Sequence, residues 1–393
     1  VAPVTPVARL WTAVFVVAFG TNVPTPLLLV YRDELGLSAD ALTGAFGVYA
    51  AGLVPALLLA GPASDRFGRR PVVVPFVVLS ALTSLLFLGA GSSTLLLFLC
   101  RFLQGAVSGV VFSVGTAWLA ELTDDPARSA RLTTVALGGG WALGPCLSGV
   151  LGQWLPWPTV LPYLMHVALM AVGLALLPGV PETLAPADRR RGALVNLGVP
   201  VPARRPFALV VVPIAIGVFT FPSTAVTVLP LLLTPTMPEI AVAITGFVAG
   251  VTLVTGTLAP PVAHRLGTSA GPAGLGVGAA GLGLALLGVE LHSWPILVPT
   301  AVLLGLGYGL CLSGGLTLVG ELASPTARGA LTGTFYACAY LGFAVPVLLS
   351  VIGGANSGVL GFVEPLGWLA AIVAVVAALL MAPRSRALVR SAA

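Results

Sequence analysis

The chain has 393 residues, of which 58% are hydrophobic and only 8% are charged. A soluble domain of this length cannot hide so much apolar surface from water, and a disordered chain needs low hydrophobicity and many charges. The composition therefore excludes both classes and favours a polytopic α-helical membrane protein. The net charge of +5 comes from arginines that lie between apolar stretches, which favours a membrane-orientation signal over binding to nucleic acid.

Twelve apolar segments follow one another along the chain, and each is close to the roughly 20 residues that a spanning helix needs. They lie near residues 7–30, 41–62, 72–91, 94–120, 130–153, 160–178, 207–232, 240–262, 272–290, 295–320, 330–352 and 360–382. Because backbone groups at membrane depth must be paired internally, the segments predict an all-α protein with twelve transmembrane helices. We expect the first segment to remain as a span and not to be a cleaved signal.

The arginines predict the orientation. If both termini are cytoplasmic, sixteen of the 18 arginines fall on the inner side, Arg32 falls outside and Arg101 falls inside the membrane. Arginine-rich loops stay on the cytoplasmic side of the plasma (inner) membrane, so we expect both termini there.

A repeat divides the chain into two halves. Glu121-Leu122 and Ala127-Arg128 recur 200 residues later, and Arg66-Phe67-Gly68 recurs as Arg265-Leu266-Gly267. These echoes predict two pseudo-symmetric six-helix bundles, which is a transporter architecture. We expect an N-terminal bundle over residues 1–180, a cytoplasmic linker over 181–206 and a C-terminal bundle over 207–393.

The loop after the second span reads Gly61-Pro62-Ala63-Ser64-Asp65-Arg66-Phe67-Gly68-Arg69-Arg70-Pro71. Glycine permits a tight turn, a carboxylate can cap a helix, and arginine can bridge acids on adjacent helix ends. The string resembles the signature loop of the major facilitator superfamily, with Ala63 in place of the usual leucine. A generic arginine-rich inner turn is the simpler alternative.

The resemblance implies the major facilitator fold and a loop that latches the two halves in the outward-facing state. It places Asp65 near the start of the eleventh span and Arg69 near Glu121. The predicted latch residues are Gly61, Asp65, Arg66, Gly68, Arg69, Arg70, Glu121 and Arg128.

The fourth span contains Arg101-Phe102-Leu103-Gln104-Gly105, with Arg101 about 10 Å below the outer boundary. The string matches a family motif that is associated with proton transfer or substrate binding, and Gln104 shares the face of Arg101. An arginine that snorkels to the interface is the alternative. Asn22, followed by Pro24 and Pro26, lies at a similar depth and predicts a broken helix that lines a cavity, with helix–helix hydrogen bonding as the alternative.

Aromatic residues within the spans could add an amphipathic wall to such a cavity, although each could equally serve packing. The candidates taken with Arg101, Gln104 and Asn22 as substrate or coupling residues are Trp141, Tyr308 and Tyr336.

The fifth span carries small residues at helical spacing, namely Gly140, Gly144, Pro145 and Gly149. They resemble the motif typical of the drug:proton antiporter and exporter branch of the family, from which Val150 departs. Small residues four apart also let any two helices approach closely, so packing without a transport direction is the alternative.

Several kinds of chemistry lack a sequence signal. No carboxylate lies deep in a span, so proton coupling would use Arg101 with substrate or water, use Asp65 or Glu121 at the inner edge, or not exist. His166 is the one histidine at membrane depth and is expected to serve packing rather than proton transfer. We find no phosphate-binding loop, catalytic constellation or metal spacing, so we expect no enzyme, cofactor or metal.

The resemblance therefore implies a secondary active transporter that exports small hydrophobic or amphipathic compounds by rocker-switch alternating access. An importer or facilitator of a sugar, amino acid or organic anion is the second hypothesis, and a membrane scaffold or receptor is the third. The expected partners are a small-molecule substrate, the lipid bilayer and, if coupling exists, protons. We expect no nucleic acid, and a monomer.

Overall fold

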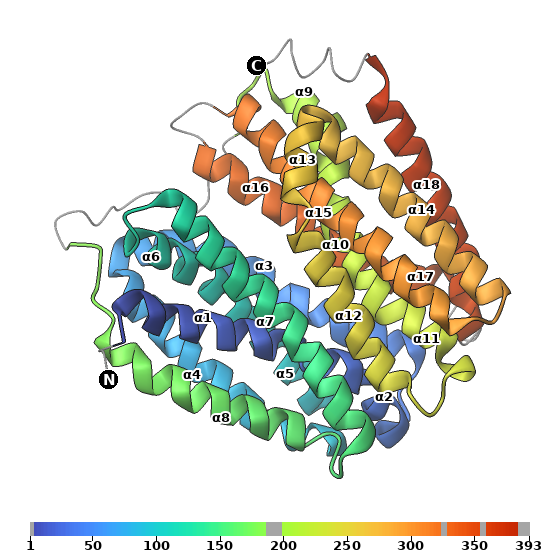
Figure 1. The fold of residues 1–393 in the computed structure, drawn as a ribbon, viewed down its shortest axis with the longest axis horizontal. Coiled ribbons are helices and arrows are strands. Elements are labelled where there is room, and N and C mark those ends of the chain that lie inside the picture. The colour runs from blue at the N-terminus through green and yellow to red at the C-terminus, as the bar shows by residue number, and fades with distance from the viewer. Residues whose placement is uncertain (1–3, 186–198, 324–327, 354–358, 384–393) are drawn as a thin grey trace. The chain divides into compact units, whose positions relative to one another are not determined.

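The computed structural model describes residues 4–185, 199–323, 328–353 and 359–383. Within these ranges the chain is helical and contains no strand (Figure 1). Eleven of the described helices are long and apolar enough to cross a membrane, and α12 (Ala241–Thr257) is a shorter apolar helix of 17 residues. The predicted all-α architecture with twelve apolar segments is confirmed.

The predicted end of the eighth segment, at residue 262, is wrong. The helix ends at Thr257, and α13 (Pro260–Leu266) begins two residues after Leu258. The proline pair at 260 and 261 explains the break, because proline lacks a backbone N–H and suits the first turn of a new helix.

The chain divides into two compact units. The first comprises residues 1–37, 45–195 and 242–250, and the second comprises 38–44, 196–241 and 251–393. The main boundary falls inside the predicted linker, but short segments at 38–44 and 242–250 belong to the opposite unit from their sequence neighbours. That the bundles over residues 1–180 and 207–393 are the two halves that move during transport stays a prediction.

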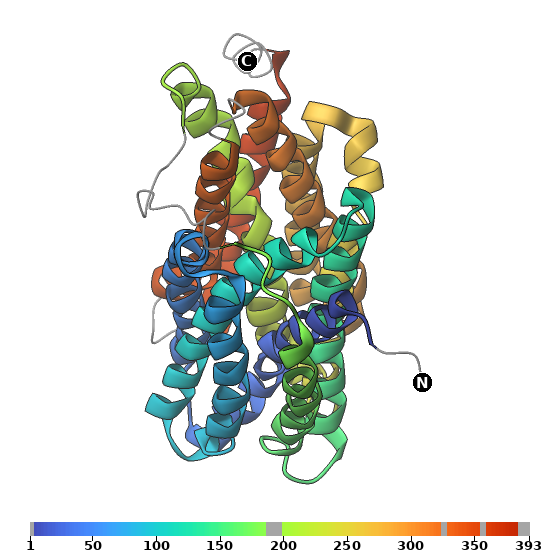
Figure 2. The same ribbon diagram turned by 90° about the vertical axis from the view of Figure 1, so that its left-hand side faces the viewer.

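The first unit is a bundle of long helices. Its elements in chain order are α1 (Pro6–Asn22), α2 (Pro24–Leu35), α3 (Ala39–Phe67), α4 (Arg69–Phe87), α5 (Thr94–Val110), α6 (Thr116–Glu121), α7 (Pro126–Trp154) and α8 (Leu161–Leu176). Helix α1 packs against α7 and α8, and α4 packs against α5 and α8 (Figures 1 and 2). Leu10, Val14, Val107 and Trp118 lie in the core between them.

Two spans of this unit are interrupted. The first span breaks between Asn22 and Pro24, as the sequence predicts, because Pro24 and Pro26 cannot donate the backbone bonds that would continue α1. The fourth span passes through a π-helical turn, Val111–Gly115, between α5 and α6. Such turns occur often at functional sites.

The second unit has more interruptions. Its elements are α9 (Arg204–Pro206), α10 (Val212–Ser223), α11 (Leu229–Leu233), the end of α12 after residue 250, α13, α14 (Ala270–Glu290), α15 (Leu297–Leu322), α16 (Arg328–Tyr340), α17 (Val345–Gly353) and α18 (Val363–Met381). Two π-helical turns separate α9, α10 and α11, and a 3-10 turn, Leu341–Ala344, separates α16 from α17. Helix α14 packs against α15 and α18, and α10 packs against α15 and α16.

One sequence echo marks the same backbone feature in both halves. Gly68 is the residue directly after α3 and has φ 104°, and Gly267 is the residue directly after α13 and has φ 55°. Residues with a side chain rarely adopt such angles, so both positions require glycine. Ala327, in a second echo, and residues 186–198 of the predicted linker lie outside the described residues.

Candidate functional site

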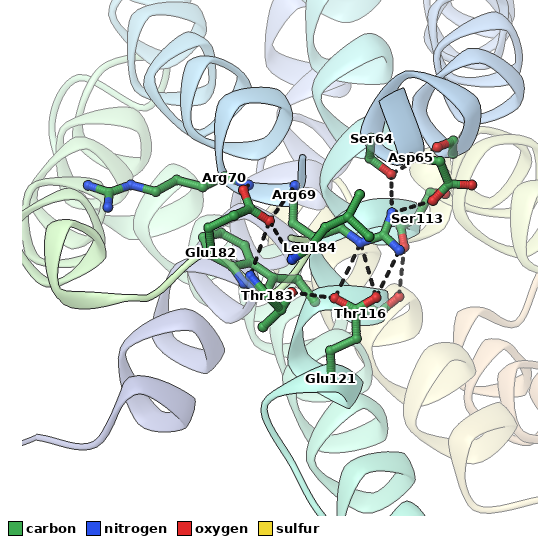
Figure 3. A network of polar contacts seen from close by, with 12 residues as sticks. Ser64, Asp65, Arg69, Arg70, Ser113, Thr116, Glu121, Glu182, Thr183 and Leu184 are labelled. Carbon is green, nitrogen blue, oxygen red and sulfur yellow. Dashed lines mark hydrogen bonds and ion pairs between the residues drawn. The ribbon is translucent and has the colours of Figure 1, made fainter. Parts of the chain in front are cut away.

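Arg69, at the first position of α4, joins the ends of three helices (Figure 3). Its Nη1 donates to Asp65 Oδ1 at 2.7 Å and to Ser64 Oγ at 2.5 Å, both near the end of α3. Its Nη2 and Nε donate to Glu121 Oε1, the last residue of α6, at 2.8 and 3.1 Å. Arg69 therefore lies against Glu121, where the motif places it.

The Arg69 network positions helix ends more than it stabilises the fold. The Arg69 side chain is 13% exposed, whereas those of Asp65 and Glu121 are 50% and 35% exposed. Ion pairs with exposed carboxylates contribute about 0–1 kcal/mol each, because water already solvates the separated charges. The planar guanidinium nevertheless fixes the orientation of the helix ends relative to one another, because it bonds two carboxylates at once.

The other predicted latch residues contribute less. Arg66 is exposed and stacks over the ring of its neighbour Phe67 at 5.3 Å, and Arg128 is exposed. Neither makes an ion pair with another described residue. Gly61 is half-buried, and the side chain of Arg70 is exposed. The approach of Asp65 to the start of the eleventh span involves both units and stays a prediction.

Sequence reasoning missed two residues of this network. Thr183 Oγ1 donates to Glu121 Oε2, and Glu182 accepts backbone N–H groups from Arg69 and Arg70 at 2.9 Å each (Figure 3). Both residues follow the last span of the first half, more than 100 residues after the loop. Their only sequence signal is an acidic residue directly after a span.

Glu182 is held in its charged form. Burial alone would raise the pKa of its carboxyl group, but hydrogen bonds from the backbone N–H groups of Leu184, Arg69, Arg70 and Thr183 outweigh burial and hold that pKa below its ordinary value. The stabilisation from this carboxylate is thus present above the ordinary range of glutamate and is lost as the pH falls through the lowered, folded-state pKa.

Arg101 forms a second, buried network in the same unit. Its side chain is fully enclosed, with 1% of the residue exposed. Its Nε donates to the Ala45 carbonyl at 3.2 Å and its Nη1 to Gln104 Oε1 at 2.6 Å, while the rings of Phe46 and Tyr49 lie 5.4 and 4.8 Å from the guanidinium carbon. The alternative of an arginine that snorkels to the interface is therefore wrong.

No carboxylate pairs with Arg101 among the described residues. Its charge is balanced by a carbonyl dipole, an amide oxygen and two aromatic faces, which attract a cation through their ring quadrupoles. A buried charge without an opposite charge is costly and usually marks a functional position in a membrane helix.

Hydrogen bonds tie this arginine to the break in the first span. Gln104 Nε2 donates to the Gly20 carbonyl at 2.7 Å, and the hydroxyls of Ser108 and Thr21 lie 3.1 Å apart. Asn22 is half-buried, and its Oδ1 accepts from Thr25 at 3.4 Å. Three predicted residues, Arg101, Gln104 and Asn22, therefore lie on adjoining segments of α5 and α1.

Each of the three predicted aromatic residues packs against another aromatic ring within its own unit. Trp141 meets the ring of Phe112 edge-on at 5.4 Å in the first unit. Tyr308 stacks on Phe219 at 6.2 Å and Tyr336 meets Phe335 at 5.7 Å, both in the second unit. Their membership of one cavity with Arg101 stays a prediction.

The glycines of α7 face two neighbours. A Cβ atom on Gly140 or Gly144 would lie 2.7 or 2.1 Å from backbone oxygens of α1, so α1 approaches too closely for a side chain. Pro145 and Gly149 instead face Gly246 of α12, in a segment that belongs to the same unit. The motif thus packs helices closely on both sides, as small residues do in membranes.

His166 serves packing. Its Nε2 lies 3.0 Å from the Val16 carbonyl, which can only accept, so Nε2 carries a proton, and its Nδ1 lies 2.6 Å from Ser84 Oγ. In the neutral ring, Nδ1 is then left to accept from the Ser84 hydroxyl. Among the described residues, no three His, Cys, Asp or Glu side chains are grouped to hold a metal ion.

Residues 10–237, more than half of the chain, match the model of the Major Facilitator Superfamily. The chain belongs to the Major Facilitator Superfamily. It is therefore a multi-pass integral membrane protein of a transporter family, which agrees with its apolar helices.

Similar proteins agree with this family. The multidrug resistance protein MdtL of Shewanella oneidensis is 35% identical over 150 residues, 37% of each chain. MdtL of Escherichia coli O157:H7 is 35% identical over 165 residues, 40% of this chain and 41% of the relative. The chain thus matches about two fifths of the length of these relatives.

Two solved transporter structures share the fold over nearly the whole length of this chain. A mutant of the nucleoside transporter NupG superposes with a TM-score of 0.77 and covers 96% of this chain and all of its own at 12% identity. A mutant of the peptide transporter POT superposes with a TM-score of 0.78, covering 97% of this chain and 95% of its own at 15% identity. At these identities they show a shared fold alone.

Proposed function

We propose that this superfamily member is a secondary active transporter that exports small hydrophobic or amphipathic compounds by rocker-switch alternating access. The observation that carries the proposal is the 35% identity to MdtL multidrug resistance proteins, over about two fifths of each chain. The glycine and proline motif of α7 supports the same direction. No observation on the second unit favours an importer of sugars or amino acids.

The Arg69 network is the proposed latch of this cycle. It joins the ends of α3, α4 and α6 through pairs that water can replace at little cost. A contact that forms and breaks once per transport cycle needs this property, because a strong pair would trap one state.

Arg101 is the proposed substrate or coupling group. Its guanidinium is buried without a carboxylate, and hydrogen bonds fix it beside the break in the first span. An anionic or oxygen-rich group of a substrate, or water that carries a proton, would supply the missing acceptor. We propose Gln104 and Asn22 as its neighbours in this role.

The remaining parts of the proposal concern topology. The arginine distribution supports both termini on the cytoplasmic side of the plasma (inner) membrane. We propose bundles over 1–180 and 207–393 as the moving halves, residues 181–206 as their linker, and one chain as the working unit without enzymatic activity.

A flux assay on the purified chain in proteoliposomes tests this function. A panel of lipophilic cations, neutral amphiphiles and organic anions is measured with and without an imposed pH gradient. We expect flux of at least one amphiphile, increased by the gradient. Flux restricted to a sugar or an amino acid would favour the importer. Equal flux with and without the pH gradient would contradict proton coupling.

The latch has its own variant pair. Asp65→Asn should lower the flux at least about tenfold, because it removes one of the two carboxylates on Arg69. Asp124→Asn is the matched control, since Asp124 is an exposed aspartate in the short turn between α6 and α7. Equal flux in both variants would contradict the latch.

A further inference from the structure

The 3-10 turn Leu177–Gly179 and Val180 are followed by four residues, 181–184, that lie against the start of α4. Figure 3 shows Glu182 of this segment beside Arg69 and Arg70. We name residues Pro181 to Leu184 the strap. They open the segment that joins the two halves of the sequence, and the loop motif gives no reason for them to lie there.

The strap completes the N-terminus of α4. A helix leaves its first four backbone N–H groups without partners inside the helix. Here Gly68 N–H donates back to Ser64 O at 2.9 Å, and Pro71 has no N–H. The two remaining donors, those of Arg69 and Arg70, each bond one carboxylate oxygen of Glu182 at 2.9 Å. Every donor at this helix end is therefore accounted for, and two of the three bond the strap.

Glu182 also explains the glycine of the loop motif. Gly68 has φ 104°, and a Cβ atom there would lie 2.7 Å from Glu182 Oε2. A larger residue would strain the backbone and push the carboxylate away from the two N–H donors. The glycine, the two arginines and the proline that follow them thus form a fitted seat for one carboxylate.

Two further contacts fasten the strap to α6 and its neighbourhood. Trp118 Nε1 donates to the Pro181 carbonyl at 3.0 Å, and Thr183 Oγ1 donates to Glu121 Oε2. Both carboxylate oxygens of Glu121 also accept from Arg69, and the shortest of these bonds, to Oε1, is 2.8 Å long. The strap therefore holds both partners of the central ion pair, the backbone of Arg69 and the side chain of Glu121.

We propose that the strap is part of the latch, and that Glu182 is a positioning residue that sets Arg69 against Glu121 and Asp65. This rests on the proposed role of the loop in transport. Glu182 does not touch the substrate in this account. It fixes the first turn of α4, and a shift of the strap moves Arg69 relative to its two carboxylates.

Amide hydrogen exchange tests the contact without any transport assay. In the purified full chain, Glu182→Ala should raise the exchange rates of the Arg69 and Arg70 amides by about fivefold, the effect of losing a typical helix cap. Glu182→Gln should act in the same direction, because its amide retains one acceptor oxygen and turns a donor toward the second N–H.

A second helix on the same loop side supplies the control. Asp125 Oδ1 caps α7 by accepting from Ala127 N–H at 2.9 Å. Asp125→Ala should raise exchange at Ala127 and leave Arg69 and Arg70 unchanged. Unchanged exchange at these two amides in Glu182→Gln would overturn the proposal, even if Glu182→Ala does not fold.

A double-mutant cycle on flux tests the action through Arg69. If Glu182 works by positioning Arg69, then Glu182→Gln combined with Arg69→Met should reduce flux no further than the worse single variant. Glu182→Asp should recover part of the flux, because it restores the charge on a shorter arm. Multiplying effects would overturn the positioning role. Raised exchange with unchanged flux in Arg69→Met would leave the strap contact intact and contradict the latch instead.

Discussion

Two arginines of the first unit show opposite ways of holding a positive charge. Arg69 lies at a helix end, partly exposed, and pairs with the carboxylates of Asp65 and Glu121. Arg101 lies inside the bundle, 1% exposed, and contacts a backbone carbonyl, an amide and two aromatic rings. The first charge is neutralised by opposite charges, and the second is only solvated by dipoles.

The difference separates two jobs. Pairs near water are cheap to break and so suit a contact that changes during transport. A buried cation that keeps its full charge attracts anions and repels cations, so it suits recognition or coupling and not a moving clasp. Variants of the two residues should therefore differ in stability, in flux and in their response to salt.

The largest effect is expected at Arg101. Arg101→Met keeps the length of the side chain and removes its charge and donors, which leaves Gln104 Oε1 buried without its partner. An orphaned buried acceptor costs about 1–3 kcal/mol. We expect this loss of unfolding free energy in denaturant titrations, and flux below about one hundredth of the original value.

Arg69→Met provides the contrast. It should change the unfolding free energy by less than about 1 kcal/mol, because its partners can turn to water. Arg101→Lys should recover little flux, since an ammonium group cannot reproduce the planar fork between Ala45 and Gln104. Equal destabilisation by the two methionine variants would remove the distinction between the networks.

A smaller effect should reach Arg101 through helix packing. An alanine at Gly144 would place its Cβ atom 2.1 Å from the Phe19 carbonyl, so α1 must shift. The next residue, Gly20, supplies the carbonyl that binds Gln104. Gly144→Ala should therefore cost about 1–3 kcal/mol and lower the flux, as overpacking does.

Gly139 is the matched control for that variant. An added Cβ atom there would lie 3.4 Å from the Phe15 ring, which is close to ordinary contact. Gly139→Ala should be neutral or stabilising, because alanine favours a helix over glycine by about 1 kcal/mol. A loss of stability in Gly139→Ala as large as in Gly144→Ala would show that the close approach to α1 is not the cause.

The fold was largely predictable because hydrophobic length and proline placement are local signals. The break at Asn22 follows from Pro24 and Pro26, and the glycine echo at 68 and 267 follows from a backbone angle that other residues avoid. The end of the eighth span was wrong by five residues, since an apolar run does not show where a proline pair starts a new helix.

The sites were less predictable because their partners come from distant parts of the chain. The motif pointed to the contact between Arg69 and Glu121, 52 residues apart, but not to Glu182, which is 113 residues from Arg69. Arg101 was recognised as buried by depth alone, whereas its contacts with Ala45 and Gly20 through Gln104 depend on how α3 and α1 pack around α5. Pattern and depth locate a charge, and only packing identifies what balances it.

The smallest expected effect is the response of the two networks to salt. Ions screen charges that water reaches, with a Debye length of about 10 Å at 0.1 M and about 3 Å at 1 M. Glu121→Gln should reduce the unfolding free energy by less than about 1 kcal/mol at low salt, and this difference should vanish near 1 M. The difference between the original chain and Arg101→Met should change much less, because the Arg101 side chain is enclosed in this conformation, with 1% of the residue exposed. Denaturant titrations of both variants at the two salt concentrations measure this, with Asp124→Asn as a control for net charge. A salt-dependent cost at Arg101 would mean that its guanidinium is open to water, and the two arginines would then differ in partners but not in burial.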